Sequence, residues 1–137
     1  ISNYIINNKK KDNTAFVLFI DEVHRYTKNI QSGIYQTGLT AIAREGRKKG
    51  IFLFLTTQNP KDVSDELLGQ IGSLLVHRLT HKNELESIKN HLSDLVFKQV
   101  IKLNRGEAIL TSINLLEDLY LIINKCDRLH YSSTIQL

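Results

Sequence analysis

The stretch Phe16-Val17-Leu18-Phe19-Ile20-Asp21-Glu22 decides the fold class of this chain. From residue 15 to residue 20 the side chains are apolar without alternation, and the run ends at two carboxylates. A strand with one face in water alternates apolar and polar residues, whereas a central parallel strand is buried on both faces and is apolar throughout. The stretch therefore predicts a buried parallel strand of an α/β domain.

The rest of the chain continues this pattern. A second apolar run occupies residues 51–56, and a helix is predicted at residues 39–49 because it ends in two lysines followed by Gly50. Beyond it we expect a short helix capped by Asp62 or Ser64, a strand at 74–79, helices at 84–92 and 95–103, and a β-hairpin-like pair at 107–111 and 119–124. This order favours a largely parallel sheet, with chemistry at the carboxyl ends of the strands.

Composition sets few further bounds. The net charge of +4 is compatible with nucleic acid but is mild, and many proteins of this charge never bind DNA. The single cysteine, Cys126, excludes an internal disulfide framework and suits a reducing, cytoplasmic environment. No apolar run approaches the ~18–20 residues that span a bilayer, so we expect no membrane segment in this chain.

Asp21 and Glu22 stand at the carboxyl end of the first predicted strand. An apolar strand followed by two acids has the form of a Walker B segment of P-loop ATPases. There the first carboxylate serves Mg²⁺, usually through water, and the second orients the attacking water. Two acids that merely start a turn after a core strand give the same pattern, so the motif alone leaves both interpretations open.

Two further features have both a functional and a structural interpretation. Gln58 follows the second strand, where RecA-like ATPases place a polar side chain that contacts the γ-phosphate; a solvated residue in the Asn59-Pro60 turn is the alternative. Arg44 and Arg47 lie at a basic helix end, where an arginine can stabilise phosphate charge in a neighbouring subunit. The alternative is a solvated helix terminus that compensates the helix dipole.

Taken together, the blocks resemble the HerA-like ATPases, of the HerA/FtsK type, over residues 16–133. In chain order they are Val17-Leu18-Phe19-Ile20-Asp21-Glu22-Val23-His24-Arg25-Tyr26, Ala43-Arg44-Glu45-Gly46-Arg47-Lys48-Lys49-Gly50, Thr57-Gln58-Asn59-Pro60, Arg78-Leu79-Thr80, Gly106-Glu107-Ala108 and Arg128-Leu129-His130-Tyr131-Ser132-Ser133. Each block is loose by itself, but their joint order is specific.

The resemblance implies a RecA-like P-loop NTPase fold and an ATP- and Mg²⁺-dependent DNA helicase or translocase. Such a protein is expected to act as a homo-hexamer around double-stranded DNA, with a nuclease or defence effector as partner. Asp21 would serve Mg²⁺ through water, Glu22 the catalytic water and Gln58 the γ-phosphate. Arg47, eleven residues before Gln58, is our choice for the arginine finger, with Arg44 second.

The chain departs from a complete P-loop ATPase in one respect. It holds no Gly-x-x-x-x-Gly-Lys-[Ser/Thr] motif, the loop that cradles the phosphates, and it holds no Met. We therefore expect that motif upstream and expect this chain alone not to hydrolyse ATP. Residues 1–14 are predicted to be the end of a preceding helix and a polar loop. Residues 15–137 are predicted to be the C-terminal part of the RecA-like domain.

Two alternatives stay open from the sequence. One is a non-catalytic ring or adaptor domain that binds DNA or a nuclease. The other is a fragment of a superfamily 2 helicase, because Asp21-Glu22-Val23-His24 also fits a DExH box, although Thr56-Thr57-Gln58 replaces the Ser-Ala-Thr-like motif. The role of His24 is equally open between coupling the acids to a ring interface and packing.

Overall fold

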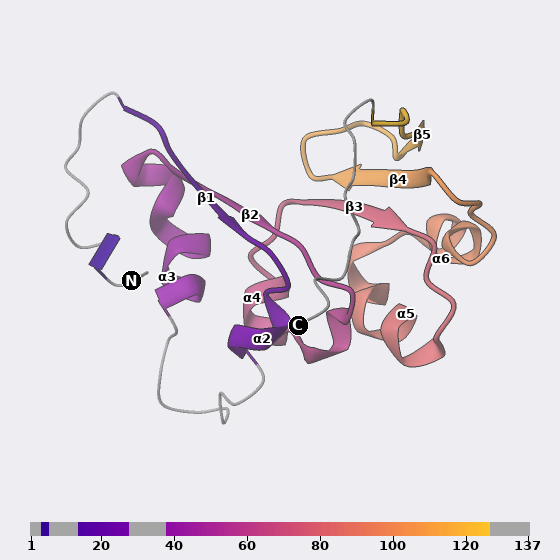
Figure 1. Cartoon of the computed structure of the whole chain (residues 1–137), viewed down its shortest axis with the longest axis horizontal. Helices are drawn as coiled ribbons and strands as arrows, with labels where there is room; N and C mark the ends of the chain where they lie inside the picture. The colour runs from indigo at the N-terminus through magenta and orange to yellow at the C-terminus, as the bar shows by residue number, and fades with distance from the viewer. Residues whose placement is uncertain (1–3, 6–13, 28–37, 127–137) are drawn as a thin grey trace, which may run out of the picture.

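The two apolar runs form a parallel pair of strands, β1 (Phe16–Ile20) and β2 (Ile51–Leu55), as predicted. The computed structural model describes residues 4–5, 14–27 and 38–126, and the parts of the chain outside these ranges, including the block at residues 128–133, lie outside the description. Pairing runs in register from the first residue of each strand to the last. The carboxyl ends of both strands therefore lie at one edge of the pair (Figure 1).

Between the two strands the chain forms α2 (His24–Thr27), α3 (Gly38–Glu45) and the 3₁₀ helix η1 (Gly46–Lys49). The predicted helix at 39–49 is thus α-helical only in its first part. At Gly46 the chain passes so close to β2 that a Cβ atom would lie 3.1 Å from the Ile51 carbonyl oxygen. Gly50 then takes a left-handed conformation (φ 68°), which suits a residue without a side chain and turns the chain into β2.

After β2 come the 3₁₀ helix η2 (Pro60–Asp62) and α4 (Asp65–Leu68). Of the two predicted caps for this helix, Ser64 is the one used, since its hydroxyl oxygen accepts from the Leu67 N–H at 3.3 Å. A capping oxygen satisfies a backbone donor that has no partner inside the helix.

The remaining strands, β3 (Ser73–His77), β4 (Glu107–Ser112) and β5 (Leu119–Ile122), form a separate antiparallel sheet in the order β3-β4-β5. The α/β class and the closing β-hairpin are confirmed. Parallel pairing is confined, within the described residues, to β1 and β2. The reason is the return path: the chain leaves β3, passes through α5 (Lys82–Ile88), the 3₁₀ helix η3 (Lys89–His91) and α6 (Asp94–Val100), and re-enters the sheet in the opposite direction.

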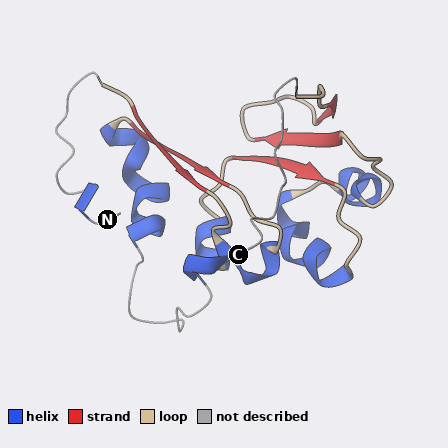
Figure 2. Ribbon diagram, in the orientation of Figure 1, coloured by secondary structure: helices blue, strands red, loops and turns tan. Residues whose placement is uncertain are grey.

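Helices cover one side of the β1–β2 pair (Figure 2). The exposure of the β2 side chains differs between its two faces. Ile51, on the covered face, is 2% exposed, whereas Phe52 and Phe54, on the opposite face, are 48% and 57% exposed. The unbroken apolar run predicted burial on both faces, and the described residues cover only one. Buried Val23, Leu39 and Leu67 form the core on that covered side. A second core, around Val76 and Ile109, lies between the antiparallel sheet and helices α5 and α6.

The helices in the described segments are too short or too polar to cross a bilayer.

Candidate active site

The candidate site lies where β1 and β2 end. The parallel hydrogen bonding continues one step past the strands: the Thr56 N–H donates to the Ile20 carbonyl at 3.0 Å, and the Val23 N–H donates to the Thr56 carbonyl at 2.9 Å. This pairing holds the residues after β1 directly beside the residues after β2. Asp21 and Glu22 thereby meet the loop that carries Gln58.

Both oxygens of the Glu22 carboxylate are held by Gln58. The Gln58 side-chain amide donates to Oε1 at 2.6 Å, and its backbone N–H donates to Oε2 at 3.2 Å. Hydrogen bonds to an ionised acceptor are shorter and stronger than those between neutral groups. Glu22 and Gln58 belong to separate blocks of the sequence, and the fold brings them into direct contact through these two hydrogen bonds.

The backbone of Glu22 is in an unusual conformation. Its φ of 51° is positive, and it is the one non-glycine residue for which this holds within the described ranges. Its N–H donates to Thr56 Oγ1 at 3.2 Å, which helps to hold the conformation. Such a residue costs of order 1–3 kcal/mol, and these outliers cluster at functional sites. This strained conformation sets the direction in which the Glu22 side chain leaves the backbone after β1.

His24 lies against the same carboxylate. Its Nδ1 atom is 3.2 Å from Glu22 Oε2 and 3.0 Å from Thr57 Oγ1, and its side chain is 11% exposed. We assign a hydrogen to Nδ1, because a nitrogen lone pair would be repelled by the carboxylate. His24 is therefore in contact with the candidate catalytic acid, which goes beyond the packing role that the sequence left open.

Asp21 is exposed at the strand end, and its Oδ1 accepts a hydrogen bond from the Thr56 hydroxyl. No group of three or more His, Cys, Asp or Glu side chains converges within the described residues. A Mg²⁺ ion does not need one, since it keeps several waters and takes one or two carboxylates together with substrate phosphates. The exposed Asp21 carboxylate fits that mode of binding.

Within the described residues neither candidate arginine forms a hydrogen bond or ion pair with Asp21, Glu22 or Gln58. Arg44, in α3, forms an exposed ion pair with Glu66, with Nη2 at 3.2 Å from Oε1. Arg47 is exposed in η1, directly before β2, whereas Gln58 follows β2. A five-residue strand spans roughly 16 Å. Arg47 and Glu22 therefore lie at opposite edges of the strand pair within one chain.

Sequence reasoning named His24 without settling its role, and it did not single out two further residues that complete the site, Thr56 and Thr57. The two threonine hydroxyls contact Asp21 and His24 respectively. The available signal was the parallel arrangement itself, because the residues that directly follow two neighbouring parallel strands lie side by side. From the parallel arrangement alone, residues 56 and 57 could have been predicted to form hydrogen bonds with residues 21–24.

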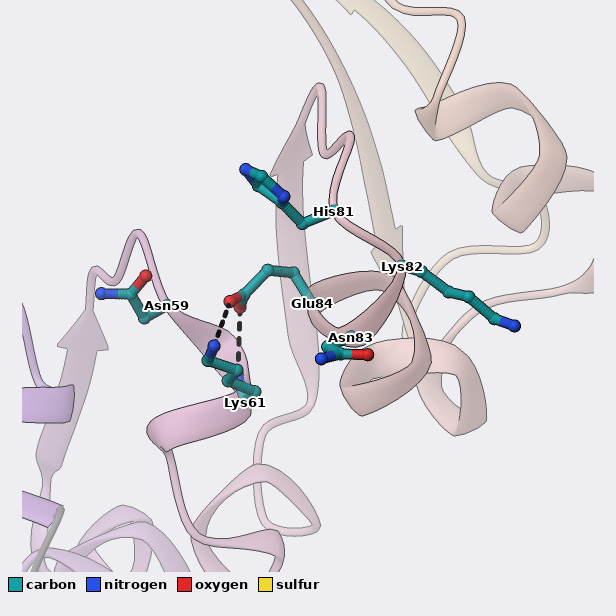
Figure 3. Close-up of a pocket in the computed structure, with 6 residues that line it drawn as sticks. All are labelled: Asn59, Lys61, His81, Lys82, Asn83 and Glu84. Carbon is teal, nitrogen blue, oxygen red and sulfur yellow. Dashed lines mark hydrogen bonds and ion pairs between the residues drawn. The ribbon is translucent and has the colours of Figure 1, made fainter.

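A polar cavity lies beside the loop after β2 (Figure 3). Its volume is about 430 Å³, and it is lined by Asn59, Lys61, His81, Lys82, Asn83 and Glu84. The cavity therefore lies between the loop that carries Gln58 and the start of α5.

The fold has solved counterparts. One is the genome packaging NTPase B204 from Sulfolobus turreted icosahedral virus 2 in complex with AMP, with a TM-score of 0.68 and 21% identity over 80% of this chain and 53% of that chain. VirB4 of Thermoanaerobacter pseudethanolicus has a TM-score of 0.61 and 17% identity over 92% of this chain and 34% of that one. At these identities the likeness shows the fold, a P-loop ATPase α/β arrangement.

Curated relatives show the family. A probable helicase of Methanocaldococcus jannaschii is 34% identical over 111 residues, which are 77% of this chain and 21% of that protein. The DNA double-strand break repair helicase HerA of Saccharolobus solfataricus is 28% identical over 97 residues, 69% of this chain and 19% of that protein. The chain thus spans about a fifth of the length of these relatives. The model of the family described as helicase HerA-like C-terminal matches residues 7–114. On these grounds the chain belongs to the HerA-like helicase C-terminal family.

Proposed function

We propose that this chain supplies the Walker B part of an ATPase domain, and that the complete protein is an ATP-driven translocase or helicase on double-stranded DNA. The observation that carries the proposal is the contact between Glu22 and Gln58 beside Asp21. Two carboxylates and an amide at the shared end of two parallel strands are the groups that such chemistry requires.

In this proposal Glu22 accepts a hydrogen bond from the attacking water and orients it. Gln58 can donate its side-chain hydrogens either to Glu22 or to a phosphate oxygen, because an amide has two donor hydrogens. The nucleotide state would then determine how firmly Glu22 is held. His24 adds a donor to the same carboxylate and limits the directions in which it can turn.

The nucleotide is proposed to be ATP with Mg²⁺, and Asp21 would contact the ion through water. The ion would neutralise phosphate charge when bound. The genome packaging NTPase B204 has been solved with AMP and with ATP-γS, which supports an adenine nucleotide as the ligand of this fold. The Thr56 hydroxyl bond to Asp21 keeps that carboxylate at the edge where the Glu22 carboxylate also lies.

The proposed substrate and the proposed assembly are each supported by a separate observation. Family membership and relatives named as DNA repair helicases support DNA as the substrate. Arg47 is exposed at the opposite edge from Glu22, so it is accessible to a neighbouring subunit, and we propose a homo-hexameric ring in which it serves a neighbour's nucleotide. We further propose a cytoplasmic location, a nuclease or effector partner, and a division of the chain at residue 14 between a preceding segment and this domain.

The test is ATP hydrolysis by the full-length protein with and without duplex DNA, together with displacement of a third strand from DNA as a measure of translocation. We expect Mg²⁺-dependent turnover that DNA stimulates. Purified residues 1–137 serve as the control and should show no turnover, since positioning of the phosphates supplies most of the catalysis. DNA binding without any hydrolysis would favour the adaptor interpretation instead.

Replacement of Asp21 by Ala should weaken binding of the Mg²⁺–nucleotide complex. The substitution removes an oxygen donor while leaving the Glu22–Gln58 contact in place. The dissociation constant of a fluorescent ATP analogue, measured with Mg²⁺ and with EDTA, should then differ much less in the variant than in the wild type. An unchanged Mg²⁺ dependence would remove Asp21 from the metal site.

A further inference from the structure

The loop after β2 is held at both of its ends. At its start Gln58 contacts Glu22. Three residues later the Lys61 N–H donates to Glu84 Oε2 at 3.3 Å, and Lys61 Nζ lies 3.5 Å from Glu84 Oε1. Because only two residues separate Gln58 from Lys61, a shift at one end must move the other.

Glu84 is an unusual residue for this position. It is 6% exposed, although it is a carboxylate in the first turn of α5. Burial of a charge is costly unless the group is paired and hydrogen-bonded. Within the described residues both oxygens of the Glu84 carboxylate contact Lys61, and Figure 3 shows that carboxylate turned toward Lys61 at the edge of the cavity.

Glu84 also belongs to the other half of the molecule. Its neighbours Leu85 and Ile88 pack in the core beneath the antiparallel sheet, together with Val76 of β3. Gln58 follows β2 of the parallel pair. The contact between Glu84 and Lys61 is therefore a polar connection from the β3–α5 unit to the loop of the candidate active site.

We infer that Glu84 is a positioning residue for ATP hydrolysis: it holds the loop after β2 through Lys61, and so sets where Gln58 meets Glu22. This inference rests on the proposed function. It also names a route by which the β3–α5 unit and the hydrolysis site affect each other, since movement of α5 carries Glu84 and the loop with it.

The test uses the full-length protein and compares Glu84→Ala with Glu84→Gln. Misplacement of a reacting group from a distance can cost up to about 10²-fold, so Glu84→Ala should lower kcat by on the order of 10–100-fold. The KM for ATP should stay nearly unchanged, because Glu84 does not touch the nucleotide. Glu84→Gln keeps an oxygen that can accept from the Lys61 N–H, and should recover much of kcat. Glu86→Gln, an exposed position on the same helix, is the matched control and should behave as wild type.

A double-mutant cycle with Gln58→Ala separates positioning from stability. If Glu84 acts through Gln58, the losses from the two substitutions should be far from additive. Additive losses, or a rise in KM at constant kcat, would overturn the inference. If Glu84→Ala does not fold, the cycle uses Glu84→Asp instead, whose carboxylate is one methylene too short to keep both contacts with Lys61. Absence of turnover in the wild-type protein would instead overturn the proposed function itself.

Discussion

Glu22→Gln in the full-length protein is expected to stop ATP turnover while ATP still binds. The carboxylate accepts at both oxygens, from the Gln58 amide, the Gln58 backbone N–H and His24. An amide has one accepting oxygen, so its NH₂ group would face a donor, and the negative charge that orients water is lost. Loss of a positioned general base lowers kcat by about 10²–10⁴-fold.

The measurement is steady-state hydrolysis together with the dissociation constant for ATP. Glu117→Gln, an exposed acid in the loop before β5, is the control and should hydrolyse ATP as the wild type does. Hydrolysis by Glu22→Gln at the wild-type rate would show that another group orients the water. A large loss of ATP affinity would instead assign Glu22 to binding.

Arg47→Ala is expected to reduce hydrolysis by about 10³–10⁵-fold, the contribution of an arginine finger supplied by a neighbour. Arg47 is exposed in η1, at the edge of the strand pair away from Glu22, so it is available to a second subunit rather than to its own site. Arg47→Lys should not restore activity, because a lysine offers a point charge without the bidentate fork. Nucleotide binding by each subunit should persist.

Mixed rings test the role of Arg47 directly. Subunits with Arg47→Ala and subunits with Glu22→Gln are each inactive alone, but some interfaces of a mixed ring join an intact Glu22 to a neighbour's intact Arg47. Partial activity should therefore return on mixing. Lys48→Ala, a neighbouring exposed cation in η1, is the control and should keep activity. If subunits exchange and no activity returns, Arg47 does not act in trans, and Arg44→Ala becomes the next variant to examine.

The sequence predicted the elements that depend on local signals. The apolar runs became β1 and β2, Ser64 capped α4, and the tail formed the hairpin of β4 and β5. These features follow from side-chain periodicity, capping oxygens and turn residues, which act over a few positions. The same signals placed Asp21, Glu22 and Gln58 each at a strand end, since parallel strands present their carboxyl ends together.

Other features were decided by contacts between distant parts of the chain. The third strand pairs antiparallel with β4, because the two helices between them return the chain in the opposite direction. The described residues cover only one face of β1 and β2, although their composition predicts two buried faces. Neither feature has a signal within a short window of sequence.

The sequence by itself therefore determined the strands and the identity of the acids and the amide at the strand ends, and it narrowed the cap of α4 to Asp62 or Ser64. Only the tertiary structure decided that Gln58 holds Glu22, that His24 joins them, and that Glu84 holds Lys61. These contacts join residues 36, 2 and 23 positions apart in the chain. The physical reason is that a hydrogen bond requires a distance of about 3 Å between donor and acceptor. That distance is set by the register of β1 on β2 and by the packing of α5 against η2, and not by local propensities.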